Sequence, residues 1–283
     1  MAALQTHQLE PFGHEVVLSS VGDIDADRSA ALRTLYQRDG LLLIRGLELS
    51  QADQIELCRH LGPVNESQFE NFLVSNVKKE GHLGTRELLW HHDVPYLPAP
   101  YLGASLHALQ VDPDAVGTRF ASGFRAYEAL PQALKDRVEG MKALHVRERV
   151  FDRRNRLTDL LEGDLCTVHD VVRRQPKTGR PYLFISENLS PCIIGLSEAD
   201  SQALLEELFG YIYEPGNVFE HRWAEGDIVI WDNQTLQHAR GLAGEGTRTL
   251  QRVTLAALGY AEQYPTDIGI YDSLGNETML ETV

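Results

Sequence analysis

A histidine and an aspartate, His91 and Asp93, stand two positions apart within the stretch W-H-H-D at 90–93. On a strand, side chains two positions apart project from the same face, so both could reach one metal ion. The chain contains 11 His and 41 Asp+Glu, and roughly one or two such pairs are expected by chance from that composition. The pair is therefore a candidate that needs support from a further ligand.

A third ligand is available at His238, which follows the apolar run G-D-I-V-I-W at 226–231 through a polar turn. A histidine at the mouth of a barrel could complete a set of two histidines and one carboxylate, which leaves three coordination positions open. That arrangement suits Fe(II) and oxygen chemistry. A structural zinc site would normally fill all four positions, usually with thiolates.

Two arginines, Arg248 and Arg252, lie on the same face of the predicted strand T-R-T-L-Q-R-V-T-L. Buried guanidinium groups require anionic partners, so an inward orientation predicts a site for an organic acid. A 2-oxo acid that chelates the iron would place its second carboxylate near Arg248, with the hydroxyl of Thr118 as a further donor. The alternative, in which both arginines face outward or pair with acids of the protein, is equally compatible with the spacing.

The elements that must position these residues change in type along the chain. Residues 26–39 and the segment opened by Ser50 predict helices, and the apolar run at 41–46 between them predicts a buried strand. From Tyr101 onward short strand-like runs dominate, interrupted by predicted helices at 126–141 and 198–212. This order predicts a mainly β fold with flanking helices: a double-stranded β-helix (jelly roll, cupin-like) with the helices on one side.

The sequence contains neither a repeat nor a Gly/Ser linker, so we expect a single domain over residues 1–283, with a core at about 15–260 and a C-terminal tail at 261–283. The tail carries apolar residues that could pack on a second copy in a homo-oligomer. The net charge of −15 argues against nucleic-acid or membrane partners. The N-terminus has no signal-peptide pattern and the three cysteines suggest no disulfide framework, so we expect the cytoplasm.

A series of short motifs occurs in a fixed order: W-H-x-D at 90–93, G-T-x-F-x-S at 117–122, H-x-V-V-R at 169–173, T-G-x-x-x-L-F-x-x-E-N at 178–188, R-W-x-x-x-D-I-x-I-W-D-N at 222–233, Q-H at 237–238 and R-x-x-x-R-x-T at 248–254. In order and spacing they resemble the taurine dioxygenase family (TauD/TfdA type) of Fe(II)- and 2-oxoglutarate-dependent dioxygenases. The similarity extends over most of the chain.

The resemblance implies a function and a set of ligands. His91, Asp93 and His238 would bind Fe(II), and 2-oxoglutarate would chelate the iron while Thr118 and Arg248 hold its far carboxylate. The implied reaction uses O2 to hydroxylate or desaturate a small, carboxylate-bearing substrate and releases succinate and CO2. A binding protein for metal and organic acid, acting as a sensor or store without turnover, is the alternative.

The expected substrate side of the site departs from the taurine enzyme. Glu87, Leu88 and Leu89 stand before the metal motif where that enzyme has polar amides, so taurine is not expected to be the preferred substrate. The 2,4-dichlorophenoxyacetate branch lacks this pattern as well. We name Arg252, Tyr96 and Glu87 as candidates for contact with an anionic substrate.

Two further features have open roles. His92 lies between the proposed ligands and is expected to be structural or to support them, with contact to the substrate as the alternative. The arginine-rich segment within 149–166 is interpreted as a solvated helix with interleaved acids, or alternatively as a lid that attracts an anionic substrate.

Overall fold

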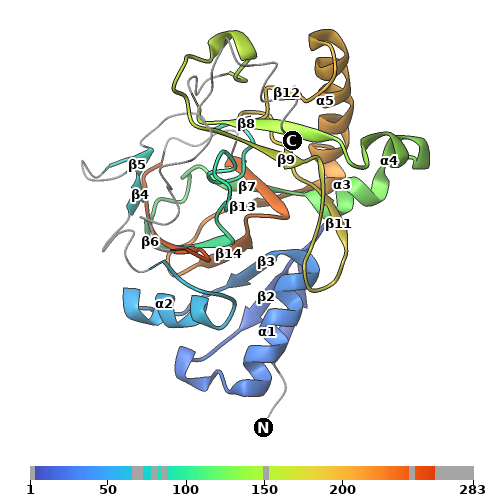
Figure 1. Cartoon of the computed structure of the whole chain (residues 1–283). Helices are drawn as coiled ribbons and strands as arrows, with labels where there is room; N and C mark the ends of the chain where they lie inside the picture. Colours follow the sequence, from blue (N-terminus) through green and yellow to red (C-terminus); the bar gives the residue numbers. More distant parts are fainter. Residues whose placement is uncertain are drawn as a thin grey trace.

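The computed structural model describes residues 4–65, 73–77, 82–83, 88–148, 153–241 and 246–258. Half of the described strands belong to one large, mainly antiparallel sheet that runs through the centre of the molecule (Figure 1). Its strands, in spatial order, are β1 (Gln5–Gln8), β2 (His14–Val17), β3 (Leu41–Ile44), β14 (Ile228–Asp232), β6 (Gly103–Val111), β16 (Arg248–Leu255), β4 (Leu73–Ser75) and β5 (His82–Leu83).

A small antiparallel sheet faces the large one and closes the jelly roll. It contains β13 (Val218–His221), β7 (Thr118–Ser122) and β15 (Leu236–Arg240). Between the two sheets lies an apolar core in which Phe120, Trp231 and Leu250 are fully buried. The expected double-stranded β-helix is therefore confirmed, and its inner faces are those that carry the candidate residues.

Shorter sheets extend the fold beyond the barrel. One contains β12 (Cys192–Ile193), β8 (Lys142–Val146) and β9 (Cys166–Asp170), and another pairs β10 (Val172–Arg174) with β11 (Pro181–Leu183). One-turn 3-10 helices lie at η1 (Val21–Asp23), η2 (Leu157–Asp159) and η3 (Pro215–Asn217).

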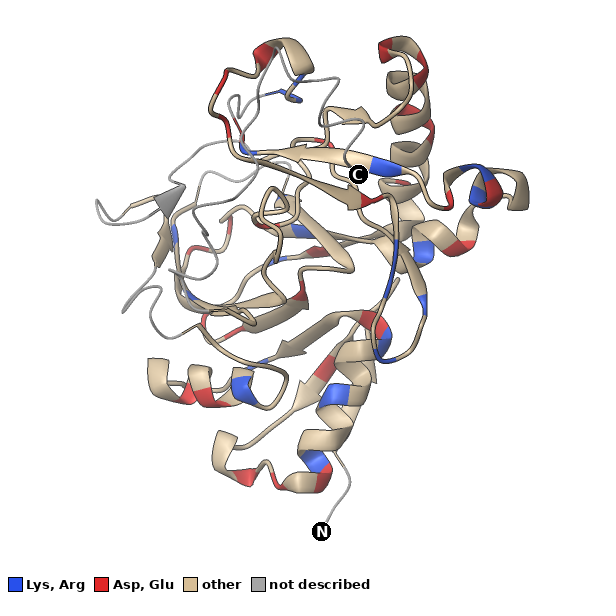
Figure 2. Ribbon diagram, viewed as in Figure 1, with Lys and Arg blue, Asp and Glu red and all other residues tan. Residues whose placement is uncertain are grey.

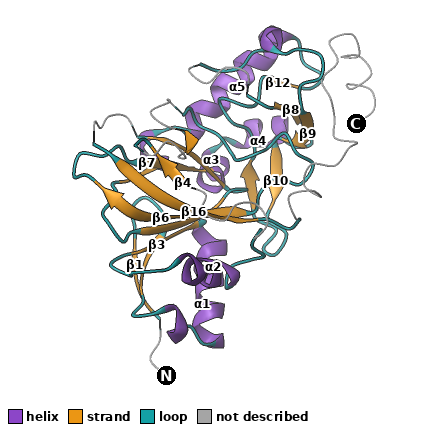
Figure 3. Ribbon diagram, turned by 90° about the vertical axis from the view of Figure 1, so that its left-hand side faces the viewer, coloured by secondary structure: helices purple, strands orange, loops and turns teal. Residues whose placement is uncertain are grey.

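The helices cover both outer faces of the barrel, so the expectation of helices on one side is wrong (Figure 3). The helices α1 (Ala26–Asp39) and α2 (Gln51–Arg59) contribute to an apolar cluster with the large sheet. The helices α3 (Gly123–Ala129), α4 (Gln132–Val138) and α5 (Glu198–Ile212) contribute to a second cluster with the small sheet. Each sheet has two apolar faces, and both must be shielded from water.

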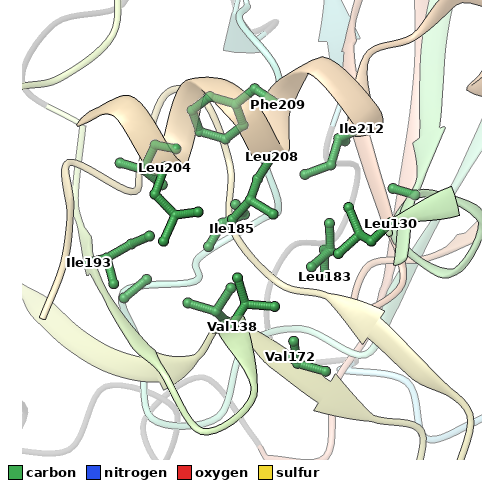
Figure 4. Packing of buried hydrophobic residues seen from close by; sticks show 14 of the residues in the cluster. Leu130, Val138, Val172, Leu183, Ile185, Ile193, Leu204, Leu208, Phe209 and Ile212 are labelled. Atoms are coloured by element: carbon green, nitrogen blue, oxygen red, sulfur yellow. The ribbon is translucent and has the colours of Figure 1, made fainter. Parts of the chain in front are cut away.

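The helix α5 shows how this outer layer is held. Its face at Leu204, Leu208 and Ile212 packs on Leu183 and Ile185 (Figure 4), and full burial of a leucine contributes about 1.5–3 kcal/mol. Its exposed face carries acidic side chains, which accounts for part of the negative charge of the molecular surface (Figure 2).

The first two helices are capped by residues at their ends. Gly40 ends α1 in a left-handed conformation with φ of 75°, where glycine has no steric penalty. Ser50 and Asp53 form a reciprocal capping box at the start of α2. The single helix expected at 126–141 is wrong: Pro131 separates α3 from α4, because proline cannot continue a helical hydrogen-bond ladder.

The residues of the expected C-terminal tail, 261–283, lie outside the described residues, so packing of the tail on a second copy and the single-domain boundaries stay predictions. Within the described ranges, every helix is too short or too polar to cross a bilayer.

Candidate metal and anion site

His91, Asp93 and His238 come together at one end of the barrel and are called here the metal triad. Each offers a ligand atom, and these atoms all lie within 4.8 Å of one another. Nε2 of His91 is 3.9 Å and Nε2 of His238 is 3.8 Å from Oδ1 of Asp93. Metal bonds to nitrogen and oxygen are about 2.0–2.2 Å long, so one ion between these atoms could contact each of them. The donor set therefore fits a divalent metal with open coordination positions.

The triad is assembled by one bridge between two distant segments. The backbone of His91 pairs with that of His238 on β15 through two hydrogen bonds of 3.0 and 3.1 Å. After His91 the chain turns instead of continuing as a strand, and Val94 takes a positive φ of 49°. The expected strand at 91–93 is therefore wrong. Asp93 reaches the rings of His91 and His238 because the chain turns after His91. The alternation of side chains along a regular strand is not the cause.

Asn233 fixes this turn from the opposite side. Its Oδ1 accepts a hydrogen bond from the backbone N–H of Asp93 at 2.7 Å, and its Nδ2 donates to the carbonyl of Asp93 at 3.1 Å. A second bond from Nδ2 reaches the carbonyl of Tyr101, and the side chain is fully buried. Sequence reasoning missed this residue, although a polar residue directly after the apolar strand β14 is a usable signal.

Asp93 is held in its charged form. Burial alone would raise the pKa of its carboxyl, but the guanidinium of Arg252 and the rings of His238 and His91 outweigh burial and hold the pKa well below its usual value. Nη2 of Arg252 lies 2.5 Å from Oδ2 of Asp93. The carboxylate thus keeps Oδ1 toward the two histidines and Oδ2 toward the arginine.

One ring nitrogen of His91 is also fixed. Nδ1 lies 2.7 Å from the carbonyl of Leu89, so Nδ1 carries the proton and Nε2 is left as a lone-pair donor on the side of Asp93. Burial lowers the pKa of His238 well below its usual value, assisted by His91. The ring of His238 is therefore neutral, as a metal ligand must be.

Thr118 and Arg248 lie together in the same cavity. Nη1 of Arg248 donates to the carbonyls of Val116 and Gly117, and it is 3.4 Å from Oγ1 of Thr118. The indole N–H of Trp223 donates to the same hydroxyl at 3.0 Å. Burial, together with the charge of Arg240, lowers the pKa of Arg248 to about 10, so its guanidinium is still charged at neutral pH. The spacing left the orientation of Arg248 and Arg252 open; both line the cavity, and Arg252 also pairs with Asp93.

The cavity has a volume of about 260 Å³ and brings metal donors and cations together. Its lining includes the metal triad, Thr118 and the arginines Arg240, Arg248 and Arg252, together with apolar side chains. Tyr96 lines it and is buried. Glu87 lies outside the described residues, so its expected contact with the substrate stays a prediction.

Three other histidines form a group that we call the histidine cluster: His92, His145 and His169, packed around Phe184. Burial lowers the pKa of His92 to about 3 and that of His169 to about 4. Nδ1 of His92 bonds to the carbonyl of Asn233 at 2.7 Å. His92 thus joins this cluster to the turn of the metal triad.

The described part of the proposed lid, from Arg153 onward, is not the solvated helix expected from its charges. Arg153 pairs with Asp159, and Arg154 lies 2.5 Å from Glu206 on α5 with its guanidinium over the ring of Phe209. These arginines are bound to acids and to an aromatic ring of the protein itself. Residues 149–152 lie outside the described residues, and the lid stays a prediction.

A jelly roll with two histidines, one aspartate and adjoining arginines in one cavity defines the class of metal-dependent oxygenases. The chain belongs to the taurine catabolism dioxygenase TauD, TfdA family, which it matches over residues 5–254. It is thus a 2-oxoglutarate-dependent dioxygenase, an oxidoreductase, as the resemblance predicted. A binding protein without turnover finds no support among the relatives.

Two relatives are similar over most of their length. The (S)-phenoxypropionate/alpha-ketoglutarate-dioxygenase of Sphingobium herbicidovorans is 31% identical over 80% of this chain and 85% of that protein. The alpha-ketoglutarate-dependent 2,4-dichlorophenoxyacetate dioxygenase of Cupriavidus pinatubonensis is 30% identical over 85% and 95%.

Solved structures confirm the fold. The structure of AAD-2 in complex with Mn(II) and N-oxalylglycine has a TM-score of 0.76 at 21% identity and covers 91% of this chain and 98% of that one. A taurine dioxygenase from Burkholderia xenovorans has a TM-score of 0.76 at 22% identity, with 97% and 98% covered.

Proposed function

We propose that this chain uses Fe(II), 2-oxoglutarate and O2 to hydroxylate or desaturate a small, carboxylate-bearing organic substrate, with release of succinate and CO2. One observation carries the proposal: metal donors and anion-binding side chains line a single cavity of about 260 Å³. A cosubstrate that must chelate iron and place a second carboxylate on a guanidinium fits that arrangement.

The metal triad would hold the iron, and Thr118 with Arg248 would hold the far carboxylate of 2-oxoglutarate. When bound, iron supplies with 2-oxoglutarate and O2 the oxidising chemistry that protein side chains lack. The protein's own part is to bind, orient and exclude water. Arg248 is anchored to the carbonyls of Val116 and Gly117, so its direction is set before the cosubstrate arrives.

The substrate would approach from the side of Arg252 and Tyr96, which line the cavity beside Asp93, and we keep Glu87 as a third candidate. The phenoxy acids named for the two relatives support an anionic substrate that also carries an apolar group. Leu88 and Leu189 in the cavity wall offer apolar contact for such a group. We expect the enzyme to work in the cytoplasm.

Succinate formation tests the proposal. The protein is incubated with Fe(II), ascorbate, O2 and 2-oxoglutarate, and a panel of carboxylic, sulfonic and amino acids is added one at a time. We expect succinate release that rises with at least one carboxylate-bearing compound and is abolished in Asp93→Ala. A complete lack of 2-oxoglutarate conversion, with and without panel compounds, would refute the proposed dioxygenase activity.

A further inference from the structure

The inner face of β15 carries a charged side chain, Arg240, two positions after the metal-triad residue His238. His238 and Arg240 are two positions apart on this strand, so both side chains project from the same face. In the antiparallel pair with β7, His238 is opposite Phe120 and Arg240 is opposite Thr118. Directly opposed residues have Cβ atoms about 4.5–5.5 Å apart, which places the base of the Arg240 side chain next to Thr118.

Arg248 reaches the same hydroxyl from β16, on the other sheet. It approaches Oγ1 of Thr118 to 3.4 Å, and Arg240 and Arg248 line the same cavity. Arg248 is buried and Arg240 is half-buried, and the charge of Arg240 lowers the pKa of Arg248, so the two like charges repel each other. Such an arrangement is stabilised when an anion enters between the two groups.

The charges of the described residues that line the cavity are unequal. Among the described residues that line it, the acidic side chains are Asp93 and Glu148. Asp93 is engaged by Arg252, and it lies at the metal triad. Glu148 gives the cavity one further negative charge against three arginines, and a divalent ion would add two more positive charges. Among the described lining residues, positive charges thus outnumber negative ones, which favours a dianion such as a 2-oxo diacid.

We propose that Arg240 is a second guanidinium for the far carboxylate of the 2-oxo diacid, acting with Arg248 and Thr118. This inference rests on the proposed function, because it assigns a further residue to the same cosubstrate. It also makes a chemical distinction. A contact to the far carboxylate must favour 2-oxoglutarate over pyruvate, which has the same 2-oxo acid group and no second carboxylate.

The test uses the full-length protein loaded with Mn(II), and titration calorimetry with 2-oxoglutarate and, by competition, with pyruvate. We expect Arg240→Gln to lower the affinity for 2-oxoglutarate about 10- to 100-fold, the range for loss of a charge-assisted hydrogen bond. Binding of pyruvate should change less than about twofold, since the contact to the far carboxylate is missing in both proteins. Arg240→Lys, which keeps the charge, should fall between Arg240→Gln and the wild type.

Arg222→Gln removes an exposed arginine and is the matched control, for which both affinities should equal those of the wild type. The proposal is wrong if Arg240→Gln binds 2-oxoglutarate with the affinity of the wild type, or if its affinity for pyruvate falls by the same factor as its affinity for 2-oxoglutarate. The latter result would mean that Arg240 acts through the metal triad. Failure of the wild type itself to bind 2-oxoglutarate would overturn the proposed function, and this inference with it. Should Arg240→Gln fail to fold, the comparison is made with Arg240→Lys alone.

Discussion

The metal triad and the histidine cluster are neighbours in the fold, and each contains more than one histidine. Their surroundings differ. In the triad, two rings with centroids 4.2 Å apart lie beside a carboxylate and line a cavity. In the cluster, three rings surround Phe184 with centroid distances of 4.5–5.3 Å. Their hydrogen bonds go to the backbone carbonyls of Asn233 and Leu97 and to the hydroxyl of Ser190.

This difference bears on which histidines of the protein could bind a metal ion. Burial lowers the pKa of His238 in the triad and of His92 and His145 in the cluster, so neutral rings occur in both groups. Neutral imidazole is necessary for metal binding, but it is present in both groups and so does not decide between them. The carboxylate of Asp93, fixed in its ionised form by Arg252, is what the triad has and the ring packing of the cluster does not provide.

The largest effect should follow from removing that carboxylate. Asp93→Ala takes away one ligand and leaves Arg252 close to the metal position, so Mn(II) affinity should fall by more than about 100-fold, beyond the loss typical for groups that only support ligands. His145→Phe, made in the histidine cluster, should bind Mn(II) like the wild type. Equal losses of Mn(II) affinity in the two variants, measured by calorimetry, would show that the metal triad and the histidine cluster do not differ in metal binding.

The hydrogen bonds that hold the turn should have the next largest effect. Asn233→Ala removes both bonds to the backbone of Asp93, so Mn(II) affinity should fall about 10- to 100-fold. Asn217→Ala is the matched control: its buried amide also donates two bonds, to the carbonyls of Ser122 and Ile212. Both variants should lose stability in denaturant, and only Asn233→Ala should lose metal affinity. A Mn(II) affinity in Asn233→Ala equal to that of the wild type would show that the turn at Asp93 keeps its conformation without these hydrogen bonds.

Acid should act on the histidine cluster in a defined direction. The folded pKa of His145 lies well below its ordinary value because the ring is buried. Below about pH 6.5 the unfolded chain therefore takes up a proton that the folded chain does not, and the free energy of unfolding falls as the pH decreases.

Each such histidine contributes up to about 1.4 kcal/mol per pH unit in this window. His145→Phe removes one of them, so its stability should decline less steeply than that of the wild type between about pH 6.5 and 4. The slope is measured by denaturant unfolding at several pH values. His7→Phe, at an exposed position of β1, is the control and should leave the slope unchanged. A slope in His145→Phe as steep as in the wild type would contradict burial as the cause.

The smallest effect is expected far from both groups of histidines. Arg154→Ala removes a partly exposed ion pair with Glu206 and the contact with Phe209, and should cost no more than about 1 kcal/mol of stability. Mn(II) affinity should not change. A clear loss of affinity would indicate that this segment contributes to the site, as the lid hypothesis requires.

The sequence allowed the sheets and caps to be predicted where local pattern and tertiary packing agree. Apolar runs such as 41–44 became buried strands, and Ser50 and Gly40 cap helices through contacts within a few residues. The placement of helices on both outer faces could not be predicted in this way, because it depends on contacts between residues far apart in the sequence.

The candidate site was also predicted only in part, because some of its features depend on contacts between residues far apart in the sequence. Residue types and spacing pointed to the metal triad and left the orientation of the two arginines open, and the motif order pointed to the family. The turn at Val94 and its fixation by Asn233 were not predicted, since they depend on hydrogen bonds across about 140 positions of the chain. The place of Arg240 in the cavity wall was also not predicted, because its position opposite Thr118 follows from the register of two strands.

The most direct test of the account is whether metal and 2-oxo diacid bind as one unit at the triad. N-oxalylglycine is titrated into the wild type with and without Mn(II), and into Asp93→Ala and His145→Phe with Mn(II). We predict one site per chain in the wild type and in His145→Phe, dependent on Mn(II), and none in Asp93→Ala. Binding of equal strength without the metal, or retained binding in Asp93→Ala, would contradict the account.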